Sequence, residues 1–252
     1  VAAFYSGGIG AGIYFLSGMV GLGFFLGEFT EKRMPVEHIV GRAAGVVGTA
    51  GFFALLLHSN FSGSNIVTVV ADYVDMYLAA SMMLYRDMGI SDEVIAELAG
   101  AMDEIRDALI MILPGMSAAA LLVIAWINTL MARMTFKVKN IFIISDAPLN
   151  TWKTPDGLVW ALIGCAALML IPGGGPKVIG INGLIVLMTI YFFQGIAIVS
   201  FYFNKKQIPF FLRVLFYAII VIQQILLMMV VGLGFFDAWF NFRRIGADPP
   251  PE

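Results

Sequence analysis

The chain has 252 residues, of which 60% are hydrophobic and 13% charged, and its mean hydropathy is +0.90. Soluble domains are about 45–50% apolar and about 25% charged, so this composition excludes an ordinary soluble domain and indicates a polytopic membrane protein. The formal net charge is −2, without a basic arm or an acidic tail, which gives no indication of nucleic-acid binding.

Two glycine-rich apolar segments form the N-terminal part of the chain. Val1–Gly27 has no charged residue and contains eight glycines, and Ala43–His58 has further glycines at 45, 48 and 51. Small residues let helices approach closely in lipid, so we expect both segments to cross the membrane, joined by a polar loop over Glu28–Arg42. Because the sequence begins with Val and not with Met, we expect that it is incomplete at this end.

The next segment, Asn65–Tyr85, is long enough to cross a bilayer, but its polar residues recur at helical spacing. Thr68, Asp72 and Asp75 lie on one stripe of a helix, together with Arg86 just beyond the segment. The segment is therefore either a span with its acids turned inward, as in an ion pathway, or a helix at the membrane interface with its acids in water. The sequence leaves both interpretations open.

Ser91–Leu113 has the pattern of one amphipathic helix. Ser91 suits the N-cap, and Asp92 and Glu93 fall in the first turn, where the helix dipole favours negative charge. Apolar residues recur every three or four positions from Ile95 onward, with most acids outside that stripe. We expect this helix to lie on the membrane surface or to pack on the protein.

Four more apolar segments bring the expected number of spans to about six: Pro114–Met134, Gly157–Ile171, Val178–Asn204 and Ile208–Phe236. The third has 27 uncharged residues and, at about 1.5 Å per residue, is long enough to cross a hydrocarbon layer of about 30 Å. The sequence thus predicts an all-α bundle in a single membrane domain, with glycine-rich spans at 1–58, an amphipathic insert at 65–113 and later spans at 114–245.

The distribution of Lys and Arg indicates an orientation. If residues 65–85 do not cross the membrane, the loops at 28–42, 133–153 and 205–213 share one side and hold 10 of the 15 basic residues. If residues 65–85 do cross, the basic residues divide 8 against 7 between the two sides. The positive-inside rule favours the first arrangement and places these loops in the cytoplasm.

Gln194, deep in the longest uncharged segment, is the main candidate for a functional residue. An amide at membrane depth is costly without a partner, so we expect it to face protein or a wet cavity and not lipid. Its role is either a ligand contact or a hydrogen bond between helices. For the first role, Tyr191, Trp160 and Asn182 are the residues we expect beside it, although Asn182 also suits a helix-end cap or an inter-helix lock.

A second group of residues is expected to lock helices together or to lie at the membrane interface. Asp237 precedes Arg243 and Arg244 by six and seven positions, which suits an ion pair or a headgroup contact, and Trp152 suits the aromatic belt. The adjacent Gln223 and Gln224 are expected to send at least one amide into the bundle.

No motif in the sequence indicates catalysis. His38, His58 and Cys165 are too few for a metal site, and there is no nucleophile motif, Walker loop, HExxH or dinucleotide fingerprint. We therefore expect neither an enzyme nor a resident cofactor or metal.

The last hundred residues carry four short patterns: W-x-x-P, G-x-N-G, Y-F-x-Q-G-x-A and G-L-G-x-x-D-x-W-x-x-F-R-R. They are formed here by Trp152 and Pro155; Gly180, Asn182 and Gly183; Tyr191, Phe192, Gln194, Gly195 and Ala197; and Gly232, Gly234, Asp237, Trp239, Phe242, Arg243 and Arg244. This combination resembles the YybS-like family of bacterial membrane proteins (DUF2232), and the resemblance extends over most of the chain. It implies a multi-pass protein of the bacterial cytoplasmic membrane.

That family is loosely similar to the S components of energy-coupling-factor transporters, which implies a small-molecule binding or transport component that needs an energising partner. The alternative from a different class is a structural or regulatory membrane subunit of a larger complex. In that case the helix at 91–113 and the basic loops would contact another protein, and the buried amides would only hold helices together.

Overall fold

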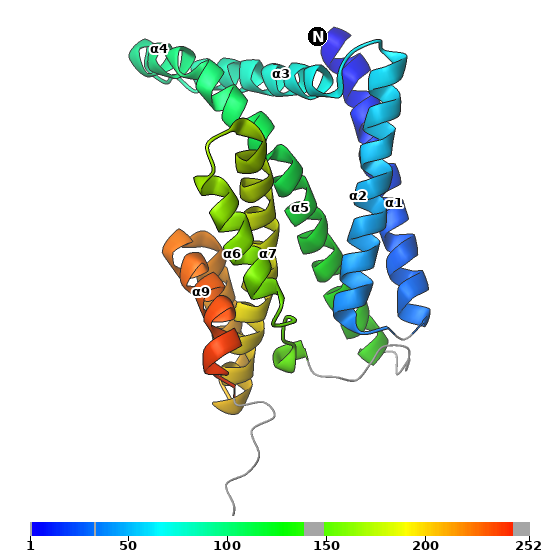
Figure 1. Cartoon of the computed structure of the whole chain (residues 1–252), viewed down its shortest axis with the longest axis vertical. Helices are drawn as coiled ribbons and strands as arrows, with labels where there is room; N and C mark the ends of the chain where they lie inside the picture. Colours follow the sequence, from blue (N-terminus) through cyan, green and yellow to red (C-terminus); the bar gives the residue numbers. More distant parts are fainter. Residues whose placement is uncertain (1, 33, 139–148, 244–252) are drawn as a thin grey trace, which may run out of the picture. The chain divides into compact units, whose positions relative to one another are not determined.

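The computed structural model describes residues 2–32, 34–138 and 149–243, with side chains for 16–32, 34–136 and 149–243. All regular structure in these residues is helical, which confirms the predicted all-α class (Figure 1). The chain divides into two compact units, Val1–Ser145 and Asp146–Glu252.

The described part of unit 1 contains five helices: α1 (Ala2–Glu31), α2 (Val36–Phe61), α3 (Ile66–Asp87), α4 (Asp92–Gly100) and α5 (Met102–Val138). The first, second and fifth run lengthwise and pack together, with α2 contacting both neighbours. Their shared core includes Leu22, Ile39 and Ala43, each at most 1% exposed.

The prediction of a polar loop over Glu28–Arg42 is wrong, because α1 continues to Glu31 and α2 begins at Val36. Pro35 precedes the first helical residue, and its fixed φ suits a helix start. Val36, Ile39, Val40 and Ala43 then form a buried face at helical spacing, so charged neighbours such as Glu37 only occupy the outer side.

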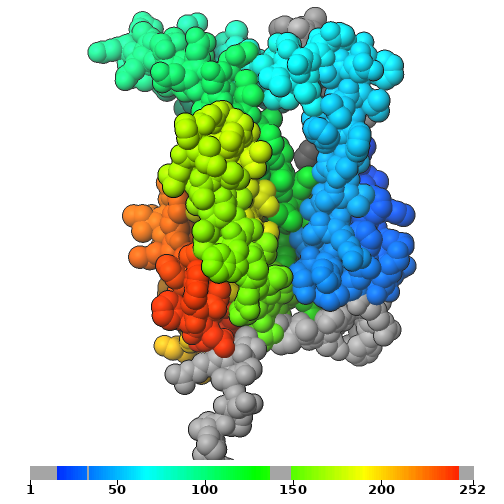
Figure 2. Space-filling model, viewed as in Figure 1, coloured from blue at the N-terminus to red at the C-terminus, as the bar shows by residue number. Residues whose placement is uncertain are grey.

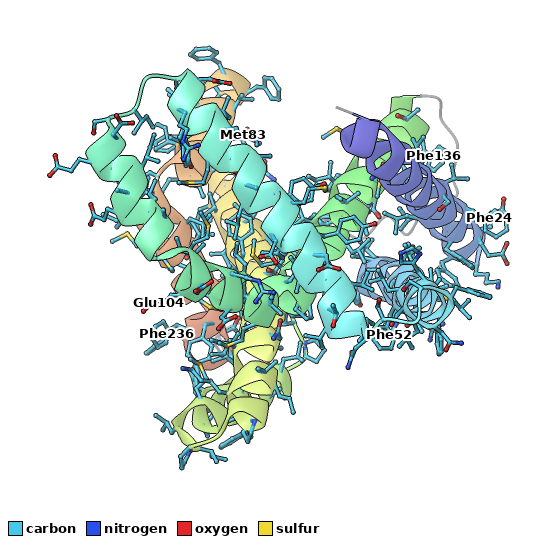
Figure 3. The ribbon with its side chains drawn as sticks, turned by 90° about the horizontal axis from the view of Figure 1, so that it is seen from above. Phe24, Phe52, Met83, Glu104, Phe136 and Phe236 are labelled. Atoms are coloured by element: carbon cyan, nitrogen blue, oxygen red, sulfur yellow. The ribbon has the colours of Figure 1, made fainter. Side chains whose placement is uncertain are left out.

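Helix α3 lies across one end of the lengthwise helices of unit 1. Figure 3 looks along α2, in which Phe52 is labelled, whereas α3, with Met83, is seen from the side. Asp72 and Asp75 are exposed, and Val69, Ala71 and Val74 are buried beneath them. Although α3 is long and apolar enough to be a span, this orientation favours the interfacial alternative, with the acids in water.

The segment 91–113 is not one helix. Helix α4 ends at Gly100, Ala101 leaves the helical conformation, and α5 runs from Met102 through Pro114 to Val138. Glycine is a weak helix former, which accounts for the break, and the expected boundary at 113/114 lies inside a helix. The amphipathic pattern itself is confirmed, since Ile95 is buried and the acids face outward. Figure 2 shows α3 and α4 as a layer across that end of unit 1.

Residues 149–243 of unit 2 form a 3₁₀ turn, η1 (Leu149–Thr151), and four helices: α6 (Leu158–Leu170), α7 (Gly174–Lys205), α8 (Phe210–Ile222) and α9 (Gln224–Phe240). α6 and α7 form a hairpin with their backbones in close contact. A Cβ on Gly180 would lie 2.6 Å from the carbonyl oxygen of Cys165, so only glycine fits there.

In the part of the chain that is described, four helices are long and apolar enough to cross a membrane, and a fifth span is counted if α8 and α9 form one. The expected number of about six is not confirmed. One reason is α6, whose 13 residues reach only about 20 Å and fall short of a hydrocarbon layer.

The apolar run from 208 to 236, expected to be one span, is two helices whose axes differ in direction by 102°. The pair starts and ends beside the same end of α7: the Ile208 amide donates to the Phe203 carbonyl (3.0 Å), and the Tyr202 hydroxyl donates to the Phe242 carbonyl (2.8 Å). We therefore interpret α8–α9 as a re-entrant pair and not as a broken span.

The break between these helices falls at Gln223 and Gln224, and both side chains are exposed. The expectation that one of them points into the bundle is wrong. Their side-chain amides lie instead at the break, where the backbone hydrogen bonds of the helix are interrupted. Polar side chains are needed at such a position in an apolar segment.

Cysteine labelling tests the re-entrant arrangement. In a Cys165→Ala background, Lys206→Cys and Phe240→Cys should react with an impermeant maleimide from the same membrane face, and Pro172→Cys, in the α6–α7 turn, from the opposite face. Reaction of the Cys at 240 from the face that labels the Cys at 172 would show that α8–α9 crosses the membrane.

Helices α7 and α9 cross with their backbones in contact. A Cβ on Gly195 would overlap the carbonyl oxygen of Val230, and one on Gly234 would overlap the carbonyl oxygen of Tyr191. These two glycines allow the close approach on which the polar contacts described below depend.

Gly195→Ala should therefore destabilise the protein by at least about 1–3 kcal/mol, because backbone atoms cannot move aside as a flexible side chain could. Gly232→Ala is the matched control on α9, since a Cβ there meets nothing within 4 Å. Thermal unfolding in detergent measures both. Equal melting temperatures for the two variants would contradict the packing described.

Candidate functional site

A buried network of polar side chains connects the parts of unit 2. It joins Thr154, which follows η1, to Gln194 of α7, to Asp237 of α9 and to Arg243, which follows α9. All four residues are buried, and Gln194 and Asp237 are 0% exposed. The network thus links three segments that are far apart in the sequence.

Gln194 uses both ends of its amide. Its Oε1 accepts hydrogen bonds from the hydroxyl and from the backbone amide of Thr154, the latter at 3.3 Å, and its Nε2 donates to Asp237 Oδ2 at 3.0 Å. The expectation that this side chain faces protein and not lipid is confirmed. Of the two roles left open, the contacts observed are those of a hydrogen bond between helices.

Asp237 accepts three hydrogen bonds. Oδ2 takes those of Gln194 and of Arg243 Nη2 (2.8 Å), and Oδ1 takes that of the Phe242 amide (2.9 Å). The last bond is local: Asn241, with φ 40° and ψ 58°, ends α9 in the left-handed conformation and turns the chain back toward the carboxylate. Asparagine tolerates this conformation better than most residues.

Arg243 forms a buried ion pair with Asp237, one of the two alternatives that the sequence left open. Its Nη1 also donates to the backbone carbonyls of Asn150 (2.9 Å) and Trp152 (2.8 Å). The guanidinium therefore fixes the η1 segment to the end of α9. Arg244, expected in the same role, lies outside the described residues.

The network lies within the membrane-spanning part of unit 2. Gln194 is about 7 Å along the axis from the middle of α7, at 1.5 Å per residue. Asp237 is hydrogen-bonded to it, and Arg243 in turn pairs with Asp237. At that depth an unpaired charge is very costly, and further hydrogen bonds to both partners help to stabilise the pair. Arg243 Nε has no partner among the described residues.

The other predicted ligand-binding residues do not gather around Gln194 as a group. Tyr191 is buried in the α6–α7–α9 core beside Val159 and Val231, and its hydroxyl has no hydrogen-bond partner among the described residues. Trp160 is 74% exposed. Asn182 donates to the Val178 carbonyl of its own helix at 2.7 Å. A ligand-binding role for these residues stays a prediction.

Sequence reasoning missed Thr154. It stands in a short irregular connector, TWKTP, where no periodicity marks a buried position. The signal that could have found it is the need of Gln194 for a second partner, which restricts the search to polar residues near the ends of the spans but does not choose among them.

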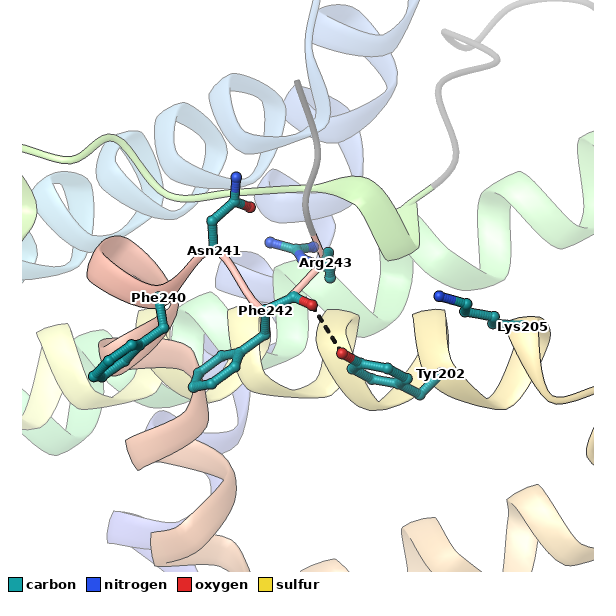
Figure 4. Close-up of a pocket in the computed structure, with 6 residues that line it drawn as sticks. All are labelled: Tyr202, Lys205, Phe240, Asn241, Phe242 and Arg243. Carbon is teal, nitrogen blue, oxygen red and sulfur yellow. Dashed lines mark hydrogen bonds between the residues drawn. The ribbon is translucent and has the colours of Figure 1, made fainter. Parts of the chain in front are cut away.

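A pocket of about 430 Å³ opens beside this network, between the last turns of α7 and the end of α9 (Figure 4). It is lined by Tyr202, Lys205, Phe240, Asn241, Phe242 and Arg243. Gln194 is not among the lining residues, so the pocket lies to one side of the amide. Within the described residues no cluster of three metal-ligating side chains occurs.

Comparison with known proteins supports the membrane class. The family described as "Predicted membrane protein (DUF2232)" matches residues 2–238. The chain belongs to the DUF2232 family. No curated protein and no solved structure matches this DUF2232 protein, and a likeness to energy-coupling-factor S components is not shown.

A double-mutant cycle tests the network of this DUF2232 protein. Asp237→Asn and Arg243→Met should each cost about 3–5 kcal/mol, because each leaves a buried polar group without its partner. The double variant should cost clearly less than the sum, since neither charge remains.

The cycle is measured by equilibrium unfolding in detergent. Thr189→Val is the control on α7, because its hydroxyl donates to the Ile185 carbonyl of the same helix (2.8 Å) and its loss should have little effect. Strictly additive effects of the two network substitutions would show that Asp237 and Arg243 do not depend on each other.

Proposed function

We propose that this DUF2232 protein is a non-catalytic, structural or regulatory subunit of the bacterial cytoplasmic membrane that acts by associating with another membrane protein. The observation that carries the proposal is that Gln194 is fully buried, is bonded through both its oxygen and its nitrogen within the chain, and is not among the residues that line the pocket. A residue used in this way holds helices together. One N–H of its amide is left, but the side chain is fully buried, so a solute would reach it only if the network opened.

The ion pair supports the same conclusion. A solute site needs polar groups that face a cavity and are incompletely bonded before the ligand arrives. Here the Asp237 carboxylate accepts three hydrogen bonds, and the Arg243 side chain is 1% exposed. Both charges serve to fix the η1 segment and α9 against α7.

The surface of unit 1 suggests how a partner is held. Residues 66–112, which include α3, α4 and the start of α5, carry nine acidic side chains, all exposed, and two arginines. One of the acids, Asp75, pairs with Arg106 at 2.6 Å, and Glu104, labelled in Figure 3, is among the others. A surface helix that binds anionic lipid is rich in Lys and Arg, so this layer suits a partner with a basic surface.

A solute-binding or transport component, energised by a partner, is the second candidate. The re-entrant pair α8–α9 favours it, because interrupted helices and ionisable groups at membrane depth are features of transporters. In that case Gln194 would exchange its bond with Asp237 or Thr154 for a bond to the solute.

Photo-crosslinking separates the two candidates. A benzophenone side chain at Glu97, exposed on α4, should give one discrete protein adduct in native membranes, and the same probe at Phe211, exposed on the apolar α8, should not. Charge reversal of Asp92 and Glu93 to Lys should abolish the adduct, since the partner is held by charge.

The solute-binding candidate predicts a different result in the same experiments. Absence of an adduct from Glu97, together with a solute that copurifies with the wild-type protein and is lost in Gln194→Leu, would favour the solute-binding candidate. Mass spectrometry of the detergent-solubilised protein detects that solute. Melting temperatures of both proteins show whether loss of the solute reflects unfolding.

A further inference from the structure

We propose that the pocket between the end of α7 and the end of α9 binds a phosphate-ester anion at the level of the lipid headgroups. This inference is independent of the proposed association with a partner. It rests on the geometry of the pocket, on a lysine that has no counter-ion among the described residues of unit 2, and on the depth at which that lysine lies.

The pocket is built by two chain segments held in register. The Tyr202 hydroxyl donates to the Phe242 carbonyl at 2.8 Å, the dashed line in Figure 4, and thereby fixes the turn after α9 to the last turns of α7. Lys205 comes from α7, and Asn241, in its left-handed conformation, comes from the turn. An ammonium and an amide thus line one cavity of about 430 Å³, which has room for a phosphate ester.

The charge of Lys205 is not neutralised by any side chain in the described part of unit 2. No acidic residue occurs in the sequence between Asp156 and Asp237, and Asp237 is buried and paired with Arg243. Lys206 and Arg213 add positive charge at the same end of α7. An anion that enters the pocket therefore meets uncompensated positive charge, as in basic pockets that bind acidic headgroups.

The depth of the lysine indicates the kind of anion. Lys205 follows the uncharged segment Val178–Asn204 and lies about 20 Å from its middle, where lipid phosphates are found. Phe240, which is 68% exposed, and Phe242 stack beside the cavity with ring centroids 5.7 Å apart. They offer an apolar contact next to the anion, which suits the glycerol and upper acyl region of a lipid. Free phosphate shares the anionic chemistry but not this contact.

Native mass spectrometry of the full chain in detergent, with added phosphatidylglycerol or phosphatidylcholine, tests the proposal. Phosphatidylglycerol adducts should exceed those of phosphatidylcholine, and Lys205→Gln should lower them about five-fold, the factor that corresponds to about 1 kcal/mol per lysine. Asn241→Gly, which keeps the left-handed turn, should lower them less. Lys177→Gln, at the other end of α7, is the matched control and should leave them unchanged.

A second arm identifies the source of the anion. If inorganic phosphate displaces phosphatidylglycerol from the wild-type protein, and Lys205→Gln prevents phosphate binding, the pocket is supported as an anion site for a soluble ligand. Equal binding of the two lipids, or equal losses in Lys205→Gln and Lys177→Gln, would overturn the proposal. Because Lys205 is exposed, its substitution should leave the melting temperature of the protein unchanged. This measurement checks that the variants fold.

Discussion

The burial of the Asp237 carboxylate determines how the second half of the chain is arranged. A charge inside the membrane must be matched by a counter-charge and by donors for its remaining lone pairs. α7 supplies one donor, Gln194, and the segment after α9 supplies Arg243 and the Phe242 amide. An apolar core of the same shape would be as stable or more so. We therefore infer that the network contributes specificity, because its hydrogen bonds form only when α7, α9 and the η1 segment meet as they do here.

The glycine contacts and the polar network depend on each other. Hydrogen bonds of about 3 Å between side chains of α7 and α9 require their backbones to approach closely, and Gly195 and Gly234 permit this at the crossing. Lipid is as apolar as the helices, so close packing and hydrogen bonds, rather than the hydrophobic effect, drive their association. The patterns Q-G and G-L-G-x-x-D in this sequence thus combine a packing residue with the polar residue that the packing brings into reach.

Composition and periodicity were sufficient to predict the helical class, the amphipathic faces of α3 and α4 and the inward direction of Gln194, since each follows from the cost of exposing one kind of group to one kind of solvent. Other features depend on partners that are distant in sequence. Thr154 has no local signature, and the re-entrant bend at Gln223 contains neither Pro nor Gly. Hydropathy measures only the apolarity of residues 208–236, which is the same whether the chain crosses the bilayer or turns back within it.

The re-entrant arrangement also makes the charge distribution of unit 2 more consistent with the positive-inside rule. The η1 segment, the end of α7 and the end of α9 are joined by hydrogen bonds and lie at one end of the unit, so Lys153, Lys205, Lys206, Arg213 and Arg243 gather there. Lys177, at the start of α7, stands at the other end. If α8–α9 were a complete span, the basic residues after α9 would lie on the side of Lys177, against the positive-inside rule. Geometry and charge, which are independent of each other, thus favour the same topology.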